Sequence, residues 1–149
     1  MIKAKIFYKS NNIIGFVIDN HAMPGDRDFN NDVLLVGEAF DMVCNSVSVL
    51  SQSVLIGIDE VLKLNCTYEI GDGYLKLDLS DFSEEELRES QVLLKTFEKS
   101  LESVISSLDQ MFGDNKRREY IKLLKDCLFA LSKFHVEMCP PSPNVTGAI

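Results

Sequence analysis

The spacing of the hydrophobic residues changes along the chain, and this change most strongly limits the folds that the sequence can adopt. Residues 2–9 alternate apolar and polar side chains, as expected of a half-buried strand. The turn residues Ser10-Asn11-Asn12 follow, and the apolar stretch 13–18 is typical of a returning strand. From Asp41 onward, apolar residues recur every three or four positions, as on one face of a helix.

Strand-like alternation returns after this helix and then gives way to helical spacing again. Residues 66–79 alternate around Gly71-Asp72-Gly73, which indicates a second hairpin. Ser83-Glu84-Glu85-Glu86 forms a capping box and opens a long helix that Gly113 can end. Residues 115–135 are amphipathic and predict a last helix before a Pro-rich tail.

These elements predict an α+β fold in the order β-β-α-β-β-α-α. The sheet is expected to be small and mostly antiparallel, with the helices packed on one face. At 149 residues the chain is long enough for one domain with a single core. Residues 1–113 would form the main body of that domain, and residues 114–149 a C-terminal helical extension and tail of the same domain.

Composition and charge limit the partners that we expect. The formal net charge is −8, so binding to nucleic acid phosphates is not expected. The longest wholly apolar runs are only a few residues, and the N-terminus lacks the apolar region of a signal peptide, so we expect no membrane span and a cytoplasmic location. The four cysteines contain no C-x-x-C pair, and in the cytoplasm they would remain thiols rather than disulfides.

Cys44 is the residue whose predicted position points most directly to chemistry. If Asp41 caps the helix, Cys44 lies in the first turn, where unpaired amides favour a thiolate and can hold an oxyanion. The helix dipole contributes only about 0.3–1 kcal/mol, whereas lowering a thiol pKa by one unit takes about 1.4 kcal/mol. A cationic partner is therefore needed, and of the two histidines His21 follows the second strand while His135 lies near the tail.

At several separated segments the chain resembles the ribosomal-processing cysteine protease (Prp) family. His21-Ala22 and then Asp41-Met42-Val43-Cys44-Asn45-Ser46-Val47-Ser48 are similar to that family's His and Cys motifs. Gly71-Asp72-Gly73-Tyr74-Leu75 is similar to its hairpin, and Gln91-Val92-Leu93-Leu94-Lys95-Thr96-Phe97 to its final helix. The resemblance covers roughly residues 1–110.

Two departures from the family pattern concern the surroundings of His21. The family has Gly on the amino side of the His and again after His-Ala, whereas this chain has Asn20 and Met23. Asn is the best substitute for Gly where a positive φ is needed. Between His21 and Cys44 there are 22 residues, about twice the usual family length.

The resemblance implies an activity and a set of site residues. The family removes a short N-terminal extension from a bacterial large-subunit ribosomal protein, so the expected partner is a basic ribosomal-protein precursor. By position, Cys44 would be the nucleophile and His21 the general base, with Asp41 and Ser48 in supporting roles. The resemblance also implies a homodimer, and it implies neither a cofactor nor a metal.

Three other readings of the same residues remain open. The fold can serve as a non-catalytic partner-binding module in ribosome assembly, in which case Cys44 would be inert. Cys44 can act as a redox sensor if Cys66 is its resolving partner. A metal site built from His21, Cys44 and Cys66 is a third reading, although the spacing of these residues gives no recognisable ligand motif.

Overall fold

The computed structural model describes residues 1–20, 33–113 and 120–127, and for residues 33–40 only the backbone. The elements follow one another as two strands, a long helix, a hairpin, a second long helix and a last strand. They are β1 (Ile2–Lys9), β2 (Asn12–Asp19), α1 (Val33–Ile56) with a π-helical continuation η1 (Gly57–Val61), β3 (Thr67–Gly71), β4 (Tyr74–Asp78), α2 (Glu84–Phe112) and β5 (Ile121–Cys127).

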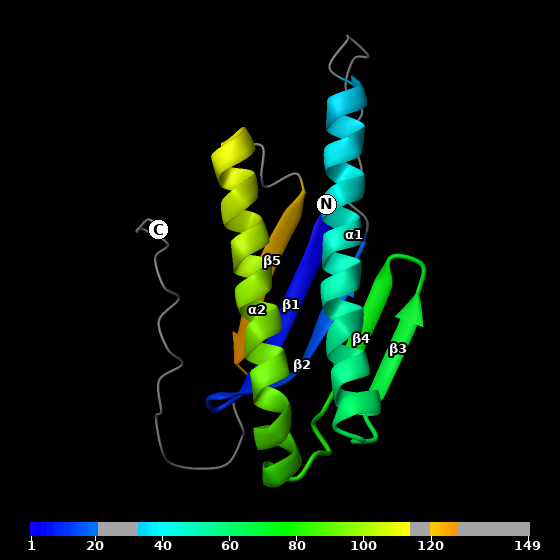
Figure 1. The fold of residues 1–149 in the computed structure, drawn as a ribbon. Coiled ribbons are helices and arrows are strands. Elements are labelled where there is room, and N and C mark those ends of the chain that lie inside the picture. Colours follow the sequence, from blue (N-terminus) through cyan, green and yellow to red (C-terminus); the bar gives the residue numbers. More distant parts are fainter. Residues whose placement is uncertain (21–32, 114–119, 128–149) are drawn as a thin grey trace.

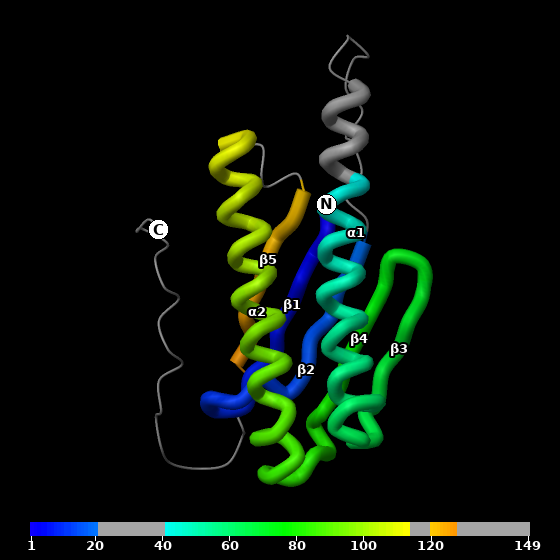
Figure 2. The backbone as a smooth tube through the Cα atoms, in the orientation of Figure 1, coloured from blue at the N-terminus to red at the C-terminus, as the bar shows by residue number. Residues whose placement is uncertain are grey.

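The strands form one five-stranded sheet in the order β3-β4-β2-β1-β5, covered on one face by α1 and α2 (Figures 1 and 2). β5 runs parallel to β1, and the other pairs are antiparallel. The predicted α+β class, with a mostly antiparallel sheet, is therefore confirmed.

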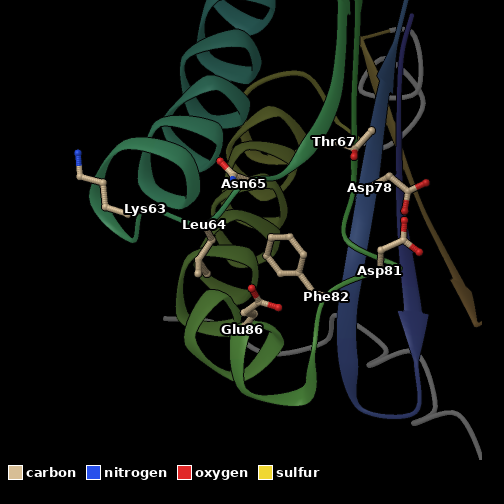
Figure 3. Close-up of a pocket in the computed structure, with 8 residues that line it drawn as sticks. All are labelled: Lys63, Leu64, Asn65, Thr67, Asp78, Asp81, Phe82 and Glu86. Carbon is tan, nitrogen blue, oxygen red and sulfur yellow. The ribbon is translucent and has the colours of Figure 1, made fainter.

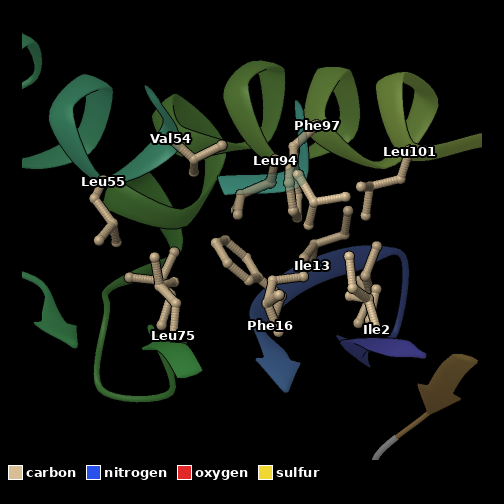
Figure 4. Close-up of a cluster of buried hydrophobic side chains, with 14 of the residues drawn as sticks. Ile2, Ile13, Phe16, Val54, Leu55, Leu75, Leu94, Phe97 and Leu101 are labelled. Atoms are coloured by element: carbon tan, nitrogen blue, oxygen red, sulfur yellow. The ribbon is translucent and has the colours of Figure 1, made fainter. Parts of the chain in front are cut away.

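The core lies between the sheet and the two helices (Figure 4). Phe16 of β2 is fully buried, and its ring lies 4.5 Å from that of Phe97 of α2, measured between centroids. Ile2, Leu94 and Leu101 are also almost fully buried. Burial of each such side chain stabilises the fold by about 1.5–3 kcal/mol, so this layer fixes both helices against the sheet.

The last predicted helix is wrong, because Ile121–Cys127 is strand β5. The seven residues pair in register with β1, from Ile2–Ile121 to Tyr8–Cys127. Ile121 is buried, and pairing with the edge of the sheet stabilises a strand that periodicity alone assigns to a helix. Tyr120, just before this strand, is a buried turn residue, and the other residues of the predicted helix lie outside the described part of the chain.

The start of the first helix also differs from the prediction. α1 begins at Val33, about two turns before Asp41. The helix continues through Gly37, because a single Gly inside a helix costs only about 1 kcal/mol. Asp41 therefore lies inside the helix rather than at its N-cap.

The segment Asp41–Val61 is long and apolar enough to cross a membrane by length and composition, with a mean hydropathy of 1.3. In this fold it is a helix packed on the sheet. Val43, Val47, Val54 and Ile58 are buried in the core. The core therefore explains part of the apolar character of this helix. Of its most apolar 18-residue window, 39% is buried.

A cluster of charged residues joins α2 to the far edge of the sheet. Lys125 of β5 forms ion pairs with Glu98 and, at 2.7 Å, with Glu102, while the Tyr8 hydroxyl donates to Glu98. Burial alone would lower the pKa of Lys125, but its bonds to Glu102 and Glu98 outweigh burial and raise it. Burial likewise opposes ionisation of Glu102, yet its bonds to Lys125 and Lys99 leave its pKa lowered.

Candidate functional site

Cys44 lines a cavity of about 100 Å³ at the boundary between α1 and the sheet. The wall includes Ser48 and Gln52 from the same helix and Asn20 from the end of β2. The β3–β4 turn closes it with Gly71, Gly73 and Tyr74. Three separate parts of the fold thus meet at one thiol.

Helical spacing explains why α1 contributes these side chains. Cys44, Ser48 and Gln52 are four residues apart and lie on one face of the helix. Cys44 is half-buried, whereas Ser48 and Gln52 are exposed. Cys44 and Ser48 thus line the same cavity, and Gln52 is an additional residue that the same spacing would have identified.

Asn20 leaves β2 in the left-handed conformation, with φ of 73°. This agrees with the expectation that Asn replaces Gly where a positive φ is needed. His21 is the next residue in the sequence, and it lies outside the described residues. The structure therefore places the amino-side neighbour of His21 at the Cys44 cavity and gives no position for His21.

The predicted helix-terminal position of Cys44 is wrong. Since α1 begins at Val33, Cys44 lies about three turns inside the helix. Amides in a helix interior donate to carbonyls four residues earlier, so those around Cys44 are not oxyanion donors in this structure. Asp41 is exposed, and it does not line the cavity.

The other cysteines in the described residues do not join Cys44. Cys66 carries a thiol, and its pKa is raised by burial and by the charge of Asp59. The effect of Asp59 means that Cys66 lies near it. Asp59 is fifteen residues beyond Cys44, or about 22 Å along a helix, so Cys66 is too far from Cys44 to act as its resolving partner. Cys127 is disulfide-bonded, contrary to the expectation that every cysteine stays a thiol.

Metal binding finds no support within residues 1–20, 33–113 and 120–127. That part of the chain contains no group of three or more His, Cys, Asp or Glu side chains able to hold an ion. The proposed set of His21, Cys44 and Cys66 is not tested as a whole, because His21 is not described.

A second hollow, of about 230 Å³, lies at the end of the β3–β4 hairpin away from the Gly71–Tyr74 turn (Figure 3). Two of its carboxylates, Asp78 and Glu86, already have structural partners. Asp78 accepts bonds from the Ser80 hydroxyl and amide, which lower its pKa, and Glu86 accepts from Ser83 in the α2 capping box. These groups stabilise a turn and a helix start, so the Cys44 cavity is the better candidate site.

The family model described as cysteine protease Prp matches residues 1–112. No curated protein sequence matches the chain significantly.

Three solved structures share the fold. SMU.848 from Streptococcus mutans is 21% identical, with a TM-score of 0.58 over 85% of this chain and 95% of that one. The essential ribosomal processing protease Prp from S. aureus, solved with a substrate peptide, is 16% identical, with a TM-score of 0.60. The same protease with a covalently linked product peptide is aligned at 18% identity and a TM-score of 0.53. Both alignments cover 85% of this chain and 100% of the protease.

Proposed function

The chain belongs to the cysteine protease Prp family, and we propose that it removes the N-terminal extension of a bacterial large-subunit ribosomal protein, with Cys44 as nucleophile and His21 as general base. The observation that supports this most is the Cys44 cavity. Its wall contains Asn20, the residue directly before His21, so the two proposed catalytic residues belong to segments that approach the same hollow. The solved S. aureus protease carries a covalently linked product peptide, as a nucleophilic mechanism would allow.

In the proposed reaction, the Cys44 thiolate adds to the scissile carbonyl carbon, and His21 carries the proton to the departing amine as the C–N bond breaks. Water, deprotonated by His21, then adds to the thioester, and the C–S bond breaks to release the extension as a carboxylate. Because the amides around Cys44 are inside a helix, we assign oxyanion stabilisation to the backbone of the Gly71–Tyr74 turn, which lines the same cavity.

Two further residues have supporting roles in this proposal. Ser48 lies one turn beyond Cys44 on the cavity wall, and its assigned role is a hydrogen bond to the bound peptide. Asp41 does not cap α1, so its proposed role is reduced to an electrostatic one, the orientation of the His21 imidazolium. No cofactor or metal takes part in the proposed reaction.

The test is cleavage of the full-length ribosomal-protein precursor by wild type, Cys44→Ala and His21→Ala. Both variants should lose cleavage while their far-UV circular dichroism spectra remain native. Mass spectrometry of the wild-type reaction stopped with acid should detect a thioester on Cys44. Cleavage that persists in Cys44→Ala would disprove the assignment of the nucleophile.

A homodimer in the cytoplasm is the second part of the proposal. Met42 and Val49 of α1 are 69% and 59% exposed, although they belong to a strongly apolar helix. Beside them lies a hollow of about 490 Å³ between α1 and α2, lined in part by Val49, Leu50 and Val104. A second copy that places the same face here would bury these side chains in a self-complementary contact.

One observation favours the alternative of a non-catalytic binding module on the same fold. Cys44 lies in a helix interior, without the terminal amides that would activate its thiol. The rate of alkylation by iodoacetamide distinguishes the two functions. A catalytic Cys44 should react faster than Cys66 by tenfold or more at pH 7, whereas a structural Cys44 should react at a comparable rate.

A further inference from the structure

The Cys44 cavity continues into a neighbouring hollow along α1, which is distinct from the hollow of Figure 3. This hollow has a volume of about 160 Å³ and lies between Ile56 and Asp59 on the helical side and Tyr68 on β3. The two hollows share Gln52 and Ile70 in their walls. Together they form a groove that runs from Cys44 along the α1–β3 boundary, and we call it the α1–β3 groove.

One wall of this groove is the edge of the sheet. Among the described strands β3 is the outermost and pairs with β4 alone, so within this part of the chain its other side has backbone groups without a strand partner (Figure 1). The β3–β4 register is regular from Thr67–Asp78 to Gly71–Tyr74, and the strand contains no proline. β3 therefore lacks these two devices by which proteins block the addition of a strand to a sheet edge.

The side chains on β3 show that the core is incomplete at this edge. Tyr68 and Ile70 are paired with Leu77 and Leu75, which are buried under the helices, so all four lie on the helix-facing side of the sheet. Tyr68 and Ile70 are nevertheless 47% and 62% exposed, and Ile56 opposite them is 50% exposed. An extended chain beside β3 would cover these apolar side chains with every second residue of its own.

The end of the groove away from Cys44 is acidic. Asp59 and Glu60 line it, and both are exposed. Asp59 is fifteen residues beyond Cys44, or about 22 Å along the helix. An extended peptide rises about 3.3 Å per residue, so this distance corresponds to about seven peptide residues.

We propose that the α1–β3 groove binds the substrate segment preceding the scissile bond as an additional β-strand on β3. Alternate apolar side chains of that segment lie against Tyr68 and Ile70, and a basic residue about seven positions before the scissile bond lies beside Asp59 and Glu60. Because β3 runs from Thr67 towards Gly71 at the Cys44 cavity, the bound segment runs parallel to β3. The inference rests on the proposed function, in which the segment before the scissile bond is the extension to be removed.

The first experiment measures kcat/KM for synthetic peptides that span the precursor cleavage site and keep between three and ten residues before it. The value should rise at least tenfold as the peptide lengthens, and Tyr68→Asp or Ile70→Asp should abolish most of that gain. Glu69→Gln is the matched control, because Glu69 lies on the opposite face of the same strand. In this variant kcat/KM should depend on peptide length as it does in wild type. A kcat/KM that does not depend on length, or variants that cleave like wild type, would overturn the proposal.

The second experiment separates the groove from the protease assignment. Binding of the ten-residue peptide is measured in the Cys44→Ala background by fluorescence anisotropy. Adding Tyr68→Asp, or the milder Tyr68→Ser if the first does not fold, should weaken binding at least tenfold. Tyr68-dependent binding without cleavage by wild type would refute the proposed function but support the groove. If wild type cleaves the precursor but the Tyr68 substitution leaves peptide binding unchanged, the proposed role of the groove is refuted and the proposed function stands. The same holds if the Tyr68 variants only convert a dimer to a monomer.

Discussion

The side-chain amide of Gln91 exchanges two hydrogen bonds with the backbone of Ile13. Gln91 Oε1 accepts from the Ile13 amide at 2.8 Å, and Gln91 Nε2 donates to the Ile13 carbonyl at 2.9 Å and to Leu87 at 3.0 Å. Ile13 lies beside the irregularity in the β1–β2 register, where ladder bonds are interrupted. A buried residue of α2 thus stabilises the hairpin whose second strand leads to Asn20 and the Cys44 cavity.

Replacing Gln91 should therefore destabilise the fold more than its size suggests. Gln91→Ala leaves a buried amide and carbonyl of Ile13 without partners, at a cost of about 2–4 kcal/mol in the free energy of unfolding. Gln91→Glu keeps an acceptor for the amide but places a carboxylate against the Ile13 carbonyl. Its loss should be large at pH 7 and partly relieved near pH 4, where the carboxyl can donate. Urea unfolding at pH 7 and pH 4 measures the free energy of unfolding of each variant. If Gln91→Ala and Gln91→Glu were equally stable at both pH values, the pair of hydrogen bonds between Gln91 and Ile13 would be contradicted.

The predictions from sequence were accurate where local pattern and tertiary packing agree. The first hairpin, the second hairpin and the capping box at Ser83 are all seen in the structure. Ile121–Cys127 was predicted wrongly, because its pairing with β1 depends on a strand more than a hundred residues away. The helix around Cys44 was predicted correctly, but its start was not, because α1 begins at Val33 and continues through Gly37. Asn20 reaches the cavity through the tertiary arrangement, which a single sequence does not encode as a motif.

The small size of the Cys44 cavity gives a prediction for Ser48. Ser48→Leu adds a branched apolar side chain to a hollow of about 100 Å³ and removes a hydroxyl from its wall. It should lower kcat/KM for the precursor by at least tenfold and leave the melting temperature nearly unchanged, since Ser48 is exposed. Ser53→Leu is the control, because Ser53 is also exposed on α1 but does not line the cavity. Equal rates for the two variants would show that substrate does not approach along this wall.

The proposed dimer gives a prediction for the outer face of α1. Light scattering at micromolar concentration should report twice the monomer mass for wild type. Val49→Lys places a charge in the middle of the apolar face and should produce a monomer with native circular dichroism, because Val49 is already 59% exposed in the single chain. Val92→Lys is the control, since Val92 is 73% exposed on α2 and does not line the hollow between the helices. A wild type that is monomeric at this concentration would disprove the homodimer.

Tyr8 should make the stability of the fold fall at alkaline pH. Burial raises the pKa of its hydroxyl, and so do the hydrogen bond to Glu98 and the charges of Glu98 and Glu102. A group whose pKa is raised by folding contributes stability that is fully present below its unfolded pKa, which for tyrosine is about 10. Above that pH the unfolded chain releases a proton that the folded chain retains, so the free energy of unfolding decreases as pH rises.

Tyr8→Phe isolates this effect from the other groups that titrate in the same range. At pH 8 the variant should be less stable by about 1.5 kcal/mol, because it loses a hydrogen bond to a charged carboxylate. As pH rises from 9 to 11, wild type should lose stability faster than the variant, and the difference between them should shrink. The raised pKa of Lys125 also destabilises the fold at high pH, but that residue is present in both proteins and largely cancels in the difference. Urea unfolding curves for the two proteins at half-unit pH steps provide the measurement, and a constant difference up to pH 11 would show that Tyr8 does not retain its proton through Glu98.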